Sequence, residues 1–184
     1  MIISRRRFAL ALLPLAFTTA CASSKRPTRV SVESKIETGY DKKIGSLVLL
    51  TPIAQPTGSP NIWPVIADSF KQRGIPCTLS PVDPLELNRG EKLSETIKQT
   101  QADHIVIIGN AAAKQQSRST VNGTESKGIT VYDAMLVSAS TRKPVWRARI
   151  VVSYFKIHHP DDLSSEIANA LLDRLSTDQL LSSP

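Results

Sequence analysis

Histidines and carboxylates that could bind a metal or transfer a proton are few in this sequence of 184 residues. Residues 158–162 (HHPDD) combine two histidines with two aspartates, which are metal-ligand residue types. Adjacent residues of an extended chain point to opposite sides, however, and Asp162 is a residue type that caps helices. We therefore interpret this segment as a strand-to-helix loop and expect no bound metal or cofactor.

Two further residues are candidates for acid–base chemistry. His104 begins an apolar run, where we expect a hydrogen-bonded structural histidine. Asp133 falls on the same face of a predicted strand as Val131 and Met135, and a β-bulge or an arginine partner explains such a carboxylate more often than catalysis does. The G-x-S-x-G, P-loop, G-x-G-x-x-G and H-E-x-x-H motifs are absent. We expect a protein that is not an enzyme, with a hydrolase of unrecognised type as the alternative.

Cys21 has the most specific chemistry, because of the segment before it. Residues 5–7 are arginines, residues 8–17 form an apolar run too short to span a bilayer comfortably, and residues 18–20 are small. This pattern resembles bacterial lipoprotein signals, in which the cysteine after the cleavage point receives a diacylglycerol on its thiol, although Thr18 stands where leucine is usual. The resemblance implies a signal peptide at residues 1–20 and a lipid anchor carrying palmitate-type chains at Cys21. Cleavage that leaves a soluble protein is the alternative.

The same segment bears on the export route and the membrane. Residues 4–8 (SRRRF) resemble the twin-arginine export motif, but ordinary signal peptides are basic too, so both routes stay open. The residue after Cys21 is Ala22, and not the aspartate that would resemble an inner-membrane retention signal. We therefore expect an anchor in the outer membrane that faces the periplasm.

The charge of the chain argues against a nucleic-acid partner. The formal net charge is +7, but three of the 23 basic residues lie in the predicted signal peptide, which leaves 20 against 16 acidic residues. These bases are scattered singly or in pairs and are not interleaved with aromatic residues. If Cys21 is acylated, Cys77 has no disulfide partner within the chain, and we expect it to be a buried small hydrophobe.

Hydrophobic periodicity from residue 42 to 184 predicts one α/β (α+β) domain with helices packed on a mixed sheet, in the order β-α-β-α-β-β-β-α. Apolar runs without alternation predict buried strands at residues 44–50 and 104–109, and the short segment 76–81, with Cys77 and Leu79, is expected to form a further strand; this order favours parallel pairing. Four-residue spacing predicts helices, at residues 62–73, 91–101 and from Asp161 or Asp162 onward. Residues 128–139 and 145–155 are expected to form a hairpin.

Two polar segments leave alternatives open. Residues 21–41 are predicted to be the acylated cysteine and a flexible tether, with an edge strand at 29–36 as the alternative. Residues 111–127 are either a long hairpin connection or a solvent-facing continuation of the strand that begins at His104.

A possible partner surface lies on the last predicted strand. Its alternation places Trp146 on the core face, and Arg147 and Arg149 together on the opposite face. If no helix covers that face, it presents a basic stripe for acidic groups of a partner or for anionic headgroups. Ordinary solvation of surface arginines is the alternative.

The hairpin sequence YDAMLVSASTRKPVWRA, residues 132–148, resembles a pattern in small periplasmic and outer-membrane lipoproteins. Ser138 stands where aspartate is usual, and Arg142 where glycine is usual. The order of elements is similar to that of envelope assembly lipoproteins and of the N-terminal domain of the TolB type. The resemblance implies a binding or assembly module of the cell envelope with an envelope protein as partner, and it supplies no catalytic residues. A structural spacer without a ligand is a further alternative.

Overall fold

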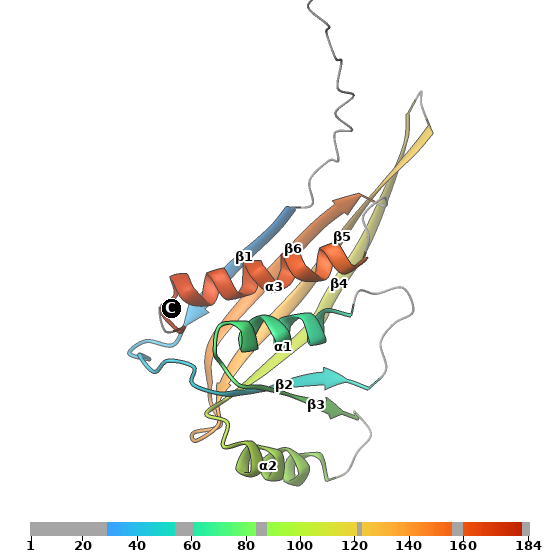
Figure 1. Cartoon of the computed structure of the whole chain (residues 1–184). Helices are drawn as coiled ribbons and strands as arrows, with labels where there is room; N and C mark the ends of the chain where they lie inside the picture. Colours follow the sequence, from blue (N-terminus) through green and yellow to red (C-terminus); the bar gives the residue numbers. More distant parts are fainter. Residues whose placement is uncertain (1–28, 54–60, 84–87, 121–122, 156–159, 182–184) are drawn as a thin grey trace, which may run out of the picture.

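The computed structural model describes residues 29–53, 61–83, 88–120, 123–155 and 160–181, which form a six-stranded sheet and three helices (Figure 1). The predicted signal peptide, Cys21, and the histidines at 158 and 159 lie outside the described residues. The strands are β1 Arg29–Ile36, β2 Leu47–Pro52, β3 Cys77–Val82, β4 His104–Thr120, β5 Gly123–Ser138 and β6 Pro144–Phe155. The helices are α1 Ile62–Gln72, α2 Arg89–Thr100 and α3 Pro160–Thr177.

The sheet is mixed, as the hydrophobic pattern predicts. Its strand order is β1-β6-β5-β4-β2-β3, with β2 parallel to both β3 and β4 and the other pairs antiparallel. The chain crosses from β2 to β3 through α1 and returns from β3 to β4 through α2. Because both crossovers are right-handed but run in opposite directions across the sheet, α1 and α2 lie on opposite faces.

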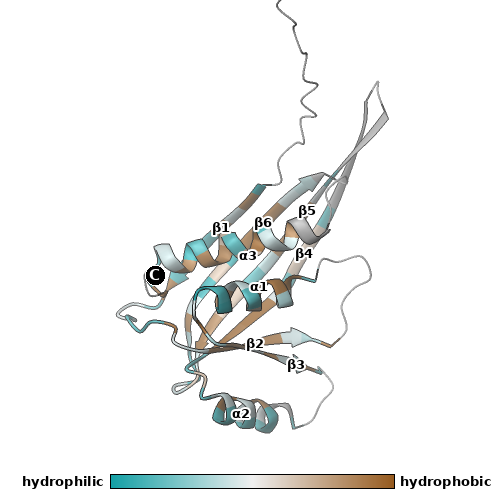
Figure 2. Ribbon diagram, in the orientation of Figure 1, coloured by the Kyte–Doolittle hydropathy of each residue, from teal (hydrophilic) through white to brown (hydrophobic). Residues whose placement is uncertain are grey.

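The first face of the sheet carries the main core. Helices α1 and α3 cover it and pack against each other, α1 over β2 and β3 and α3 over β1 and β6 (Figure 1). In Figure 2 hydrophobic and hydrophilic positions alternate around α3, as expected of an amphipathic helix. The leucines at four-residue spacing, Leu163, Leu171 and Leu175, are all buried with Ile167 in this core.

The second face is only partly covered. Helix α2 packs on β2 and β3, and Val48 and Ile105 are buried on this face, outside the main core cluster. No described helix covers the second face over β5, β6 and β1. We call this area the open face; it includes Glu33, Lys35, Asp133, Met135, Arg147 and Arg149.

Residues 29–36 form edge strand β1, so the prediction of a flexible tether is wrong for this part of the chain and the alternative holds. A polar network attaches the strand to the core. Arg174 Nε of α3 donates to Ser34 Oγ at 2.6 Å, and Ser34 Oγ in turn donates to Asp178, which also accepts a hydrogen bond from Trp146 Nε1 at 2.7 Å. Such pairing depends on partners more than 100 residues away, which local periodicity does not reveal.

Of the two alternatives for residues 111–127, the continuation of the strand that begins at His104 is the one found, because residues 111–120 extend β4 as an antiparallel ribbon with β5 (Figure 1). The register shifts between Asn110 and Ala112, where β4 contains one extra residue. This bulge reverses which residues of β4 face each side. Lys114 therefore shares a face with Ile129 and with the open face, whereas an unbroken strand would place it on the core side.

Helix starts differ slightly from expectation. Helix α3 begins at Pro160, so Asp161 and Asp162 lie inside it and the predicted cap is wrong; proline suits the first turn, where an N–H is not needed. Asn61 occupies the N-cap of α1 without a side-chain capping hydrogen bond. None of the helices in the described residues has the length and apolarity required to cross a bilayer.

Candidate functional site

His104 is a buried residue whose two ring nitrogens are both hydrogen-bonded. Its Nδ1 lies 2.7 Å from Asp103 Oδ1 and its Nε2 lies 2.5 Å from the Tyr40 hydroxyl. Asp103 also accepts hydrogen bonds from the backbone N–H groups of Gly45 and Ser46. Burial, with the charge of Asp103 second, raises the pKa of Tyr40. This cluster joins the loop before β2 to the start of β4, which is the structural role expected of His104.

Asp133 lies on the open face, where its carboxylate is 53% exposed. Asp133 shares its face with Val131 and Met135, as predicted, but this is the open face, because the core face of β5 carries Tyr132, Ala134 and Leu136. Arg149 Nε donates to Asp133 Oδ1 at 3.1 Å, and this arginine partner was one of the two explanations expected from the sequence. His104 and Asp133 lie on opposite faces of the sheet and do not form one site.

A row of charges crosses three strands at Arg149. Cross-strand register places Arg149 between Asp133 on β5 and Glu33 on β1. Side chains opposite each other on neighbouring strands lie about 5 Å apart at Cβ, so Glu33 is a cross-strand neighbour of Arg149, while Asp133 forms the ion pair with its guanidinium. The charge of Arg149 is therefore matched within the sheet.

Arg147, two residues earlier, has a different environment. Its cross-strand neighbours are Met135 on β5 and Lys35 on β1, and within the described residues neither Arg147 nor Lys35 has a salt bridge. Like charges directly opposite each other destabilise a sheet. The sheet thus holds two unmatched cations side by side on an exposed surface.

These residues line a shallow depression of about 580 Å³ on the open face. Beside it, a crevice of about 320 Å³ runs between α2 and the sheet. Met135 and Ile107 line both hollows, so the two are continuous. The crevice is mainly apolar, and α2 contributes Leu93 and Ile97 to it. Together they make a groove with a basic end at Arg147 and an apolar end under α2.

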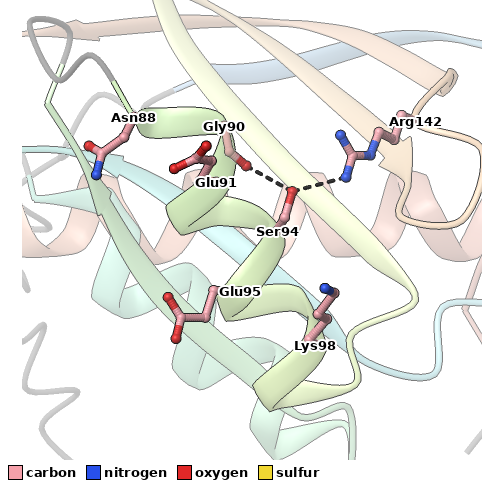
Figure 3. Close-up of a pocket in the computed structure, with 7 residues that line it drawn as sticks. All are labelled: Asn88, Gly90, Glu91, Ser94, Glu95, Lys98 and Arg142. Atoms are coloured by element: carbon pink, nitrogen blue, oxygen red, sulfur yellow. Dashed lines mark hydrogen bonds between the residues drawn. The ribbon is translucent and has the colours of Figure 1, made fainter.

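Arg142 closes the far end of the groove. It lies in the β5–β6 turn with a φ of 55°, a left-handed conformation that glycine adopts more readily than other residues. Its Nη2 donates to Ser94 Oγ at 2.9 Å, and Ser94 Oγ donates to the carbonyl of Gly90 at 2.8 Å (Figure 3). The turn is thereby attached to α2. A second, more polar hollow of about 770 Å³ lies over these residues.

The remaining candidate residues lie elsewhere. Cys77 is buried under α1, and burial raises the pKa of its thiol to about 11 although Lys71 lowers it. Among the described residues, no three His, Cys, Asp or Glu side chains are placed to hold a metal ion. The exposure of Arg147 and Arg149 agrees with the sequence-based interpretation. Lys35 was missed because β1 was assigned to the tether, and no local signal reveals its place beside Arg147.

No protein-family model and no curated protein sequence matches this chain. Among solved structures, it is similar to the PelC dodecamer from Paraburkholderia phytofirmans, with a TM-score of 0.54 and 12% identity over 84% of this chain and 100% of that one. The lipoprotein GNA1162 from Neisseria meningitidis has a TM-score of 0.43 at 11% identity, covering 72% of this chain and 99% of its own. TolB from Acinetobacter baumannii has 0.35 at 10% identity, with 81% of this chain and 32% of TolB covered. The PelC likeness concerns the fold alone, and the other two are too low to support an argument.

Proposed function

We propose that this protein is an outer-membrane lipoprotein of the bacterial envelope, anchored through Cys21, whose domain binds an acidic segment of an envelope protein in the groove of the open face. Two features support an anchored binding module: the export pattern that ends at Cys21, and a sheet face that helices leave half covered. The observation that carries the binding site is the unmatched pair of cations, Lys35 and Arg147.

The chemistry of the groove determines what it would bind. An acidic side chain or a chain carboxylate placed between Lys35 and Arg147 relieves their repulsion and forms charge-assisted hydrogen bonds with the guanidinium. An apolar side chain next to that acid fits the crevice lined by Met135 and Leu93. Glu33 and Asp133 repel a fully anionic partner, so the groove favours a segment in which acidic and apolar residues are mixed.

Arg147→Glu tests the site without unfolding the protein. The new carboxylate lies opposite Lys35 and replaces a repulsive pair with an attractive one, so we expect the melting temperature to stay the same or rise slightly. A photo-crosslinker at position 135 should give a discrete adduct in cells, and Arg147→Glu should reduce its yield several-fold. Lys42→Glu, an equal charge change at an exposed loop position, is the matched control and should leave the adduct unchanged.

An adduct pattern that is the same in the Arg147→Glu and Lys42→Glu proteins contradicts the proposed site.

The anchor has its own test. Cys21→Ser removes the thiol that accepts the lipid, so we expect the protein to lose the diacylglycerol mass and its outer-membrane fractionation. Identical mass modification and fractionation of the wild type and the variant contradict the anchor.

A further inference from the structure

The start of β1 and the far ends of β4 and β5 lie at the same end of the sheet (Figure 1). Cross-strand register connects them: Arg29 pairs with Ser153, Ser153 with Ile129, and Ile129 with Lys114. From Lys114 to the end of β4 there are six more residues, or about 20 Å of ribbon at about 3.4 Å per residue. The ribbon thus extends past the point where the chain enters the sheet.

The linker to the proposed anchor has a matching length. Eight peptide steps separate Cys21 from Arg29, which span at most about 28 Å. The ribbon's 20 Å is shorter than this limit. A bilayer that holds the lipid on Cys21 therefore lies within reach of this end of the sheet.

This end of the sheet is also basic. Arg29, Lys114 and Lys127 are exposed, and the register and the bulge in β4 place all three on the face that continues the open face. In the sequence, residues 22–28 contain two bases and no acid, and residues 111–127 contain three bases and one acid, Glu125. Asp133 lies further along β5, beside Arg149. The linker and the ribbon therefore each carry a net positive charge.

We propose that the sheet is inclined to the membrane that holds Cys21, so that the ribbon lies along its surface and Arg29, Lys114 and Lys127 contact the anionic phospholipid headgroups. The inference rests on the proposed anchor and adds an orientation to it. Headgroup phosphates attract cations near the surface and hold them there when a lipid chain supplies the first attachment. Lys35 lies six residues further along β1 than Arg29, or about 20 Å, so the inclined sheet holds the groove at Lys35 away from the membrane surface, open to a periplasmic partner.

Lysine labelling in vesicles tests this orientation. The full-length protein, purified from membranes, is reconstituted into vesicles of phosphatidylcholine alone or with phosphatidylglycerol, treated with an amine-reactive reagent and analysed by mass spectrometry. We expect labelling of Lys114 and Lys127 to fall at least about threefold when the anionic lipid is present. Lys98, exposed on α2 away from this end, should be labelled equally in both. Lys114→Glu should restore labelling of Lys127, and Lys98→Glu should not.

The outcomes separate this inference from the anchor. Flotation with the vesicles reports the anchor, whereas the lysine pattern reports the contact with headgroups. A protein that floats but shows equal labelling of Lys114 and Lys127 in both vesicle types retains the anchor and overturns the inference. If Lys114 and Lys127 are protected from labelling in intact cells but not in anionic vesicles, the contact with headgroups is overturned. A bound protein would then cover this end of the sheet.

Discussion

Asp178, in the turn after α3, joins three elements of the fold, and its removal tests what holds β1 in place. Its Oδ2 accepts hydrogen bonds from Trp146 Nε1 of β6 at 2.7 Å and from Ser34 Oγ of β1, and its Oδ1 lies 3.2 Å from Arg174 Nη2 of α3. The side chain of Asp178 is 13% exposed, and Trp146 is 3% exposed. Water cannot easily replace the carboxylate in this position.

The magnitude follows from these contacts. Asp178→Ala leaves the buried indole N–H of Trp146 without a partner, which costs about 1–3 kcal/mol. The ion pair with the partly exposed Arg174 adds less than about 1 kcal/mol, because solvent screens it. We expect the free energy of unfolding to fall by about 3 kcal/mol and the melting temperature by about 6–12 °C in a protein of this size.

Urea denaturation and thermal melts measure the change, with Asp173→Ala as the matched control. Asp173 also lies on α3 and pairs with Arg73 at 3.0 Å, but its side chain is 74% exposed, so its loss should cost less than about 1 kcal/mol. In a double-mutant cycle, Trp146→Phe and Asp178→Ala should couple by about 1–2 kcal/mol. Equal effects of the two aspartate substitutions, or no coupling to Trp146, would refute the reasoning.

Three further predictions concern single positions, measured by thiol labelling or urea denaturation. Burial keeps the Cys77 thiol protonated up to a pKa of about 11, so native labelling near about pH 8 should be at least about tenfold slower than in urea. Stability should fall between pH 9.0 and about 11, where only the unfolded thiol ionises. Gly128→Ala places a Cβ 2.4 Å from the ring of Tyr154 and should cost about 1–3 kcal/mol, whereas Gly109→Ala has nothing within 4 Å and should change stability by less than about 0.5 kcal/mol. Arg142→Gly and Arg142→Ala both remove the hydrogen bond to Ser94, but only glycine relieves the φ of 55°, so Arg142→Gly should be the more stable by about 1 kcal/mol; equal stability of the two would contradict the strain.

The parallel part of the sheet was predictable because its signals are local. Unalternating apolar runs marked β2 and the start of β4, and four-residue spacing marked α1 and α2 between the parallel strands. The alternation in β6 correctly assigned Trp146 to the core and Arg147 to the opposite face. Each of these inferences depends only on residues within one element, where the period of the backbone decides which side chains share a face.

The candidate site could be predicted only in part. Arg147 and Arg149 were recognised as exposed cations, but periodicity did not show that Arg149 pairs with Asp133 whereas Arg147 has no salt bridge within the described residues. That difference arises from the registers of β5 and β1 against β6. The pairing of Arg29–Ile36 with β6 brings together residues more than 100 positions apart, and its own alternation of apolar residues is weak.

By itself, the sequence determined the order and type of most elements, the faces of β6 and the export pattern before Cys21, because each is written in neighbouring residues. Only the tertiary structure decided which face of the sheet stays uncovered, since that depends on the handedness and direction of two crossovers. It also decided, through one extra residue in β4, that Lys114 joins the open face. Such a bulge changes side-chain direction by half a period, and only the pairing with β5 reveals it.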